Sequence, residues 1–231
     1  MLRADLVCGV DRDRRGEVSR AGDARFLTLA SPAEAEHRER ASRFLAIAFP
    51  VDTEESAREW LAVRSTAYFD ARHHCAAWRL RNGTWRALDA GEPSGTAGMP
   101  ILAAIDARGL LDVGVVVTRY FGGTKLGAGG LARAYTEAAT AALALAPTRT
   151  AIPATRMEID YPFPLTSAVM RALERCAARD IDHGFARSGS FGRVRFTIPR
   201  DQLPLLETFL REQTSGVLAA VEVGQTVIYE P

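Results

Sequence analysis

Residues 112–146 read DVGVVVTRYFGGTKLGAGGLARAYTEAATAALALA, and this stretch decides the fold. The apolar run from Val113 to Tyr120 predicts a β-strand, and the alanine-rich run after Gly130 predicts a helix. Between them, five glycines fall within the nine residues 122–130, and they let the backbone turn tightly and approach other groups closely. A glycine loop at the start of a helix presents free N–H groups and the positive end of the helix dipole. The stretch therefore predicts strand, loop and helix, with a potential anion site at the loop.

Lys125 lies in the middle of this loop and is the only lysine of the chain. Every other residue among the 29 lysines and arginines is an arginine. A compact, strongly hydrated ammonium group is not interchangeable with a planar guanidinium group. Lys125 is therefore the first candidate for contact with an anionic ligand.

The composition of the whole chain is that of an ordinary globular protein. Its 231 residues are enough for one large domain or two small ones. Hydrophobic residues make up 47%, charged residues 25%, and the formal net charge is +1. The net charge gives no global argument for binding to nucleic acid or to a membrane. No apolar run reaches the length of a membrane span, so no membrane partner is expected.

The cysteine spacing and the N-terminal charges indicate the cellular compartment of the protein. Cys8, Cys75 and Cys176 are odd in number and far apart, with neither C-x-x-C spacing nor a paired framework. Charges between Arg3 and Arg15 break up any secretory apolar region. Both features predict a reduced, cytoplasmic protein. Residues 1–24 are charged and irregular, and we expect them to form a flexible leader.

Residues 25–150 alternate between predicted strands and helices. Strands are expected at 26–29, 42–51, 74–81, 85–88 and 113–120, and helices after Thr53, from Pro100 and after Gly130. Between residues 44 and 49 apolar side chains fall on both faces, which suits a strand covered on both sides. Asn82-Gly83 predicts a hairpin turn, and residues 32–40 are expected to form a charged connector.

Residues 147–153 contain two prolines and no periodicity, and they predict a linker. The elements expected beyond it are a strand at 156–161, a helix at 165–178, strands at 180–187 and 191–199, a helix after Asp201 and a strand at 217–223. This β-α-β-β-α-β order is that of the ferredoxin-like fold. We therefore expect an α+β protein with two domains, 25–150 and 151–231.

Three stretches together resemble the IMPACT/YigZ family. They are SRFLA at 42–46, GEPSGTAGMP at 91–100 and VVVTRYFGGTKLGAGGLARAY at 115–135. His73, His74 and Cys75 also resemble the H-x-C strand of the family. The resemblance covers residues 25–146, and the C-terminal pattern is similar to the small domain of the bacterial YigZ-type members.

The resemblance implies both a fold and a function. The N-terminal domain would share the fold of the second domain of a small-subunit ribosomal protein and of domain IV of elongation factor G, and the C-terminal domain would resemble domain V of that factor. It implies a non-enzymatic protein that engages RNA or the ribosome in translation or stress regulation. Two positions depart from the family pattern: Ala90 follows Asp89 where a second acidic residue is usual, and Ala76 follows Cys75 where an aromatic residue is usual.

The two glycine segments each precede a predicted helix on the same sheet, so we expect them to line a shared groove. There Lys125, Arg119 and backbone N–H groups would meet a phosphate. Glu92, Ser94 and Thr96 would form the opposite lip. The alternative is architectural: the glycines serve tight turns and close helix–sheet contact, and Glu92 caps a local turn. The expected groove residues are Glu92, Ser94, Gly95, Thr96, Arg119, Tyr120, Gly122, Gly123, Lys125, Gly127, Gly129, Gly130 and Arg133.

Two other functions stay open for the same groove. An enzyme acting on a phosphorylated small molecule or nucleotide is one, but GAGG at 127–130 lacks the serines of small-molecule kinase loops. The segment also fails the Walker pattern, since no Lys-Ser or Lys-Thr follows the last glycine. A protein-interaction module, with a partner docked on the glycine loops, is the other. We expect no catalytic residue and no cofactor.

Two further candidate sites are weaker. His73, His74 and Cys75 alternate between the faces of a strand, so they cannot all bind one ion, and no metal is expected. Arg187, Arg193 and Arg195 form a secondary basic face that would contact an RNA backbone. Pairing with opposite charges across the strands is the alternative for that face.

Overall fold

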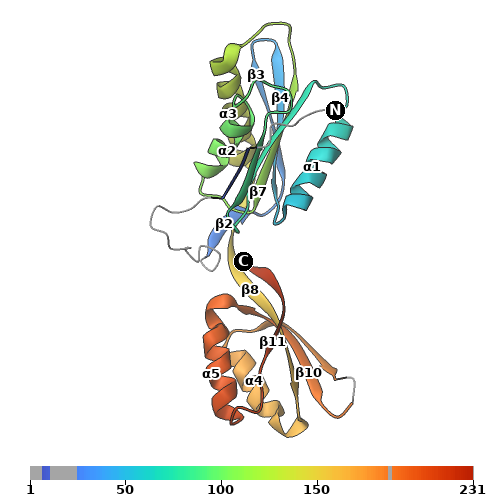
Figure 1. Ribbon diagram of the computed structural model, residues 1–231, viewed down its shortest axis with the longest axis vertical. Coiled ribbons are helices and arrows are strands. Elements are labelled where there is room, and N and C mark those ends of the chain that lie inside the picture. Colours follow the sequence, from blue (N-terminus) through green and yellow to red (C-terminus); the bar gives the residue numbers. More distant parts are fainter. Residues whose placement is uncertain (1–6, 11–24, 187–188, 231) are drawn as a thin grey trace. The chain divides into compact units, whose positions relative to one another are not determined.

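The computed structural model describes residues 7–10, 25–186 and 189–230. The described residues form two compact units, an N-terminal unit with residues 7–10 and 26–150 and a C-terminal unit with residues 151–230, and each unit has a sheet and an apolar core (Figure 1). Helices and antiparallel strands are mixed in both units. The expected α+β class is therefore confirmed.

The sheet of the N-terminal unit has the strand order β1-β6-β5-β7-β4-β3, and neighbouring strands run antiparallel. Its strands are β1 (Val7–Val10), β3 (Ala33–Glu39), β4 (Ser42–Pro50), β5 (His73–Arg79), β6 (Thr84–Leu88) and β7 (Val113–Tyr120). The short β2 (Phe26–Leu29) is followed by Ala30, whose N–H donates to the carbonyl of Pro147 at 2.7 Å.

Helices cover both faces of this sheet (Figure 1). α1 (Glu54–Ala67) lies on one face, and α2 (Gly98–Asp106) and α3 (Gly127–Leu145) lie on the other. Along β4, Phe44 packs in the core shared with α2 and α3, whereas Phe49 packs in the core shared with α1. This alternation of two apolar sides confirms the expectation of a strand covered on both faces.

The structure also contains the helix start and the hairpin turn that two local sequence signals predicted. Thr53 is the N-cap of α1, and its hydroxyl accepts a hydrogen bond from Ser56 N at 3.2 Å. Asn82 and Gly83 connect β5 to β6, and Gly83 has a φ of 86°. That conformation is easy for glycine, which explains why the Asn-Gly pair marked the turn correctly.

Three expectations about irregular segments differ from the structure. The expected connector at 32–40 contains β3, which pairs with β4 at the edge of the sheet. The expected linker at 147–153 falls largely within β8 (Thr148–Tyr161). The expected leader contributes β1, which pairs with β6, and the rest of residues 1–24 lies outside the described residues.

The C-terminal unit has the expected order of elements, β-α-β-β-α-β. After β8 come α4 (Thr166–Arg175), β9 (Arg179–Phe185), β10 (Gly192–Pro199), α5 (Leu203–Gln213) and β11 (Val221–Tyr229). The strands are ordered β11-β8-β10-β9, and both helices pack on one face of the sheet (Figure 1). The last strand begins four residues later than the expected start at 217.

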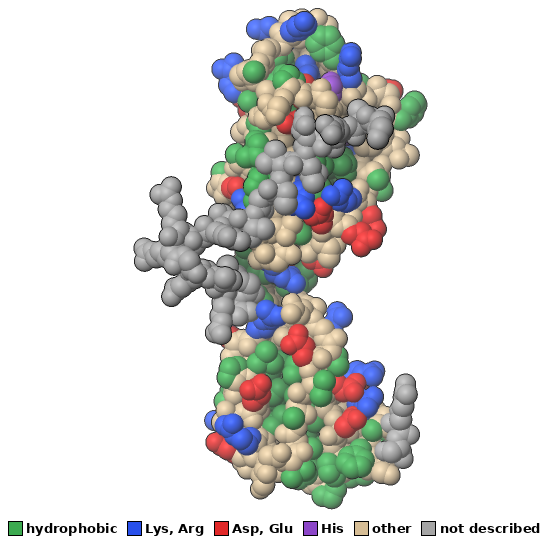
Figure 2. Space-filling model, in the orientation of Figure 1, with side chains coloured by type: hydrophobic (Ala, Val, Ile, Leu, Met, Phe, Trp, Pro, Cys, Tyr) green, Lys and Arg blue, Asp and Glu red, His purple; other side chains and the backbone are tan. Residues whose placement is uncertain are grey.

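Charged side chains of both signs are interspersed over the visible face of both units (Figure 2). This mixture agrees with the formal net charge of +1 and shows no extended basic surface on that face. Within the described part of the chain, no helix combines the length and the apolar character that crossing a membrane requires.

Candidate functional site

A pocket of about 500 Å³ lies at the N-terminal end of α3. Four segments contribute to it: the start of β5, the loop between β6 and α2, the end of β7, and the loop leading into α3. The lining residues are Arg72, His73, Gly91, Glu92, Pro93, Arg119, Phe121, Lys125, Leu126, Gly127, Ala128 and Leu131. Both glycine segments of the sequence therefore contribute to one concave surface.

Asp89 fixes the loop between β6 and α2. Its carboxylate accepts hydrogen bonds from the N–H groups of Gly95 at 2.7 Å, Ala97 at 3.0 Å and Gly98 at 2.8 Å. Gly91 has a φ of 85°, in the left-handed region that glycine adopts without strain. A single carboxylate that binds three backbone N–H groups holds the loop in one shape, so its first residues reach the pocket in a defined position.

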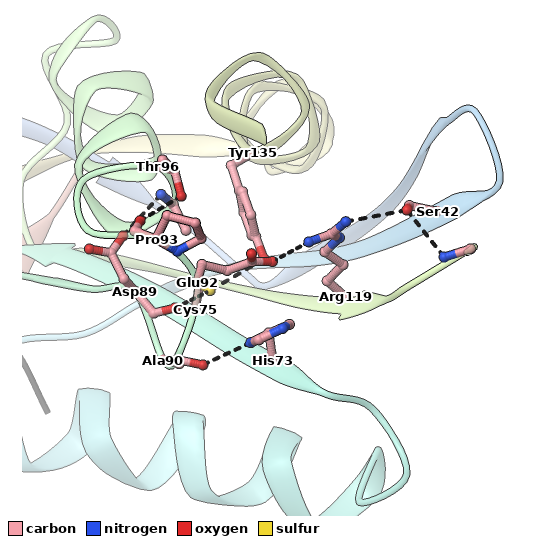
Figure 3. A network of polar contacts seen from close by, with 12 residues as sticks. Ser42, His73, Cys75, Asp89, Ala90, Glu92, Pro93, Thr96, Arg119 and Tyr135 are labelled. Atoms are coloured by element: carbon pink, nitrogen blue, oxygen red, sulfur yellow. Dashed lines mark hydrogen bonds and ion pairs between the residues drawn. The ribbon is translucent and has the colours of Figure 1, made fainter. Parts of the chain in front are cut away.

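Arg119 and Glu92 form a buried ion pair in the wall of the pocket (Figure 3). Arg119 Nη1 lies 2.6 Å from Glu92 Oε1, and the two side chains are only 5% and 4% exposed. The hydroxyl of Tyr135 donates to the same carboxylate oxygen at 2.9 Å. Arg119 Nη2 also donates to Ser42 Oγ at 3.5 Å. The opposite charges compensate each other, so this wall offers no free positive charge.

Cys75 extends this network toward the Asp89 loop. Its Sγ atom lies 2.9 Å from the carbonyl oxygen of Asp89 and 3.3 Å from the hydroxyl oxygen of Tyr135. Burial raises the pKa of the Cys75 thiol and the pKa of the Tyr135 hydroxyl, because a buried anion loses its hydration. A protonated, fully buried thiol is a poor nucleophile, so the contacts of Cys75 indicate a structural residue.

The roles of Arg119 and Glu92 differ from those expected for the groove. There, Arg119 was to meet a phosphate while Glu92 stood on the opposite lip. In the structure the two side chains are bonded to each other, and the guanidinium group is committed to the carboxylate. The architectural alternative differs as well, because Glu92 accepts from Arg119 and Tyr135 instead of capping a turn.

Lys125 and Arg72 are exposed cations of the pocket, and neither makes an ion pair within residues 25–186 and 189–230. No side chain caps the start of α3, so the first-turn N–H groups there are open to a ligand. Phe121, beside them, is 45% exposed. The pocket therefore combines two free cations, a helix N-terminus and an exposed aromatic ring.

The other expected groove residues lie outside the pocket lining. Tyr120 donates its hydroxyl to Asp70 at 2.7 Å, and Thr96 is buried. Gly122 has a packing role, because a Cβ there would lie 2.0 Å from the carbonyl carbon of Ala41. The close contact at Gly122 is of the kind that the architectural alternative expects of a glycine. The remaining residues of this group are Ser94, Gly95, Gly123, Gly129, Gly130 and Arg133.

Sequence reasoning missed His73 as a pocket residue. His73 stands opposite Arg119 in the register of β5 and β7, and its Nδ1 lies 3.0 Å from the carbonyl oxygen of Ala90. The alternation of β5 places His73 on the same side as the core residues Cys75 and Ala77, and this signal could have found it. The other lining residues outside the expected set are Arg72, Gly91, Pro93, Phe121, Leu126, Ala128 and Leu131.

The secondary basic face is neutralised. Arg193 Nε lies 2.6 Å from Asp160 Oδ1, and Arg195 Nε lies 2.7 Å from Glu158 Oε2. The paired residues stand opposite each other on β10 and β8. Cross-strand ion pairing, the alternative considered for this face, is therefore the arrangement found, and it leaves neither arginine free for an RNA backbone. Arg187 lies outside the described residues.

Across the described ranges, no three histidine, cysteine, aspartate or glutamate side chains gather in a way that would hold a metal ion. His73 and His74 bond to different partners, the carbonyl of Ala90 and the hydroxyl of Thr118.

Comparison with known proteins gives the family. The model of the Impact N-terminal domain matches residues 40–143. An IMPACT family member in the pol 5′ region of Thermus thermophilus is 46% identical over 157 residues, covering 68% of this chain and 83% of that protein. YigZ of Escherichia coli strain K12, an IMPACT family member, is 28% identical over 204 residues, covering 87% of this chain and 98% of YigZ.

Two further proteins are similar to this chain. YvyE of Bacillus subtilis strain 168, also an IMPACT family member, is 43% identical over 112 residues, and the match spans 52% of its length. A crystal structure described as that of a hypothetical protein superposes with a TM-score of 0.64 at 27% identity, covering 86% of this chain and 97% of the other. With close to half the chain matched by the family model and a 46% identical relative matched over most of its length, this chain belongs to the IMPACT family.

Proposed function

We propose that this protein is a non-enzymatic, cytoplasmic binding protein that engages RNA, including RNA of the translation apparatus, through the pocket at the start of α3. The observation that carries the proposal is the grouping of Lys125, Arg72 and exposed Phe121 around one pocket. The likeness to domains IV and V of elongation factor G that the family resemblance implies points in the same direction.

The cations of the pocket suit the phosphates of a nucleic acid. Lys125 and Arg72 have no carboxylate partner among the described residues, so their charges are available to a ligand. The open N–H groups at the start of α3 favour an anion in the same place. Cations that neutralise phosphates release counterions, so binding of this kind weakens as salt rises.

Phe121 favours a nucleic acid over a simple phosphate compound. Its ring is 45% exposed, and Arg119 Cζ lies 5.5 Å from the ring centroid, which holds the ring beside the pocket. Aromatic side chains next to a positively charged surface are typical of proteins that bind single-stranded nucleic acid, where stacking contributes about 1–3 kcal/mol per base. One nucleotide could thus place its phosphate on the cations and its base on Phe121.

Replacing Lys125 by alanine tests the proposal. Fluorescence anisotropy with a labelled single-stranded RNA should show about tenfold weaker binding, since one charge-assisted phosphate contact is lost. Between about 50 mM and 200 mM salt, the slope of log affinity against log salt should become less steep by roughly 0.7.

Arg108→Ala is the matched control, because Arg108 is an exposed arginine of the same unit outside the pocket lining. It removes the same charge and should leave the affinity for RNA nearly unchanged. The proposal fails if the wild type binds no RNA at any salt concentration. A thermal shift with nucleotides or phosphate that disappears in Lys125→Ala, without RNA binding, would favour an enzyme of small phosphorylated molecules. Loss of a protein partner with no effect on RNA would favour an interaction module.

A further inference from the structure

His73 has one ring nitrogen committed to the protein. Its Nδ1 lies 3.0 Å from the carbonyl oxygen of Ala90 (Figure 3). A carbonyl oxygen only accepts hydrogen bonds, so Nδ1 must carry the proton. In the neutral ring this leaves Nε2 without a proton, as a hydrogen-bond acceptor. The tautomer of His73 is therefore set by the backbone.

The accepting nitrogen is available to a ligand. His73 lines the pocket, and among the described residues its ring has no hydrogen-bond partner besides Ala90. The hydrogen bond between Nδ1 and the carbonyl of Ala90 fixes the orientation of the ring. In Figure 3 the other ring nitrogen points away from Ala90. His73 is thus a positioned acceptor in a pocket whose free charges are positive.

The groups of the pocket correspond to the parts of a ribonucleotide. Lys125 and Arg72 suit a phosphate, and Phe121 suits a base. An acceptor requires a donor, and the phosphodiester backbone of DNA has none. In RNA the 2′-hydroxyl is a donor, and it is the group by which proteins distinguish RNA from DNA.

We infer that His73 selects RNA over DNA by accepting a hydrogen bond from a ribose 2′-hydroxyl at Nε2. The inference rests on the proposed function, because the ribose must belong to a nucleic acid held by Lys125 and Arg72. It adds the kind of nucleic acid and the residue that distinguishes it.

The first test changes only the sugar of the ligand. Three labelled oligomers are compared: oligouridylate, its 2′-fluoro analogue and its 2′-deoxy analogue. All three have the same base and the same backbone charge. The 2′-fluoro sugar keeps an RNA-like pucker but cannot donate. In buffer of pH about 8, the full-length protein should bind the ribo-oligomer about three- to tenfold more tightly than either analogue.

The second test changes the protein. In His73→Asn the side-chain amide nitrogen can replace Nδ1 and still donate to Ala90, but no acceptor stands in the place of Nε2. This variant should bind the ribo-oligomer and the 2′-fluoro oligomer equally, with its affinity for the 2′-fluoro oligomer unchanged. His74→Asn is the control, because His74 bonds to Thr118 and does not line the pocket. It should keep the wild-type preference.

The outcomes separate the inference from the proposed function. Equal binding of all three oligomers by the wild type, weakened by Lys125→Ala, overturns the role of His73 and leaves RNA binding through the pocket in place. A preference for ribose that survives in His73→Asn also overturns it. Absence of binding to any oligomer overturns both.

Discussion

Replacing Arg119 by methionine is expected to lower the free energy of unfolding by about 3–5 kcal/mol, because it leaves the carboxylate of Glu92 buried without its partner. The Glu92 side chain is only 4% exposed, so water cannot replace the lost guanidinium group. The measurement is urea unfolding followed by tryptophan fluorescence. All three tryptophans, Trp60, Trp78 and Trp85, lie in the N-terminal unit, so the signal reports on the unit that carries the mutation.

Two controls give this result its meaning. The double variant Arg119→Met with Glu92→Met removes both charges and should recover most of the loss, since paired apolar side chains can replace a buried ion pair. Arg43→Met breaks an ion pair with Glu36 in which both side chains are partly exposed, at 45% and 32%, and should lower stability far less than Arg119→Met does. A double variant as unstable as the single one would show that the charge left on Glu92 is not the cause.

Gly98→Ala is the second change with a large expected effect, about 3 kcal/mol or more of lost stability. A Cβ at Gly98 would lie 2.4 Å from the backbone N of Leu88 and 2.7 Å from the backbone C of Ala87. These are main-chain atoms at the end of β6, so the start of α2 would have to move away from the sheet. The same fluorescence-detected urea unfolding measures the loss.

Gly129→Ala is the matched control for this prediction. Gly129 lies in α3, and a Cβ there would meet nothing within 4 Å. Alanine is the better helix former by roughly 0.5–1 kcal/mol, so this variant should be equal to the wild type or more stable. If both glycine variants lost similar stability, close backbone approach would not explain the Gly98 effect.

β3 and the first part of β8 are strands that the sequence pattern did not indicate. β3 has the sequence AEAEHRE, and alanine and glutamate are depleted in strands. It forms because Ala33 and Ala35 pack on the N-terminal core while Glu34 binds Arg64 at 2.8 Å. These partners are distant in sequence, so tertiary contacts decided the structure of a segment whose composition indicated a connector.

The first part of β8 was expected to be a linker because of Pro147 and Pro153, whereas residues 156–161 were expected to be a strand and lie within β8. Proline removes a backbone donor and is usually excluded from the middle of a sheet. At Pro153, β8 pairs with β11, whereas its pairing with β10 begins only at Ala154. Pro153 therefore lies just outside the stretch of β8 that pairs with both β10 and β11. A local sequence pattern contains the proline but does not show which strands pair with β8 at that position.

The site was predictable in its position and not in its chemistry. The glycine segments and Lys125 were visible in the sequence, and they do line one pocket. The alternation of β7 also places Arg119 on the side of Val115 and Val117, which face the core under α2 and α3. That pattern predicts a buried arginine, but only the folded structure supplies its partner, since Glu92 comes from a loop 27 positions earlier.

The chain of contacts from Ser42 through Arg119, Glu92 and Tyr135 to Cys75 has an evolutionary consequence. Each side chain is a hydrogen-bond partner of the next, so the effect of a substitution at one position depends on the residues present at the others. We expect these five positions to change together among relatives or not at all. A graft of the glycine loops onto another scaffold would need all five residues, because the loops alone carry only part of what gives them their shape.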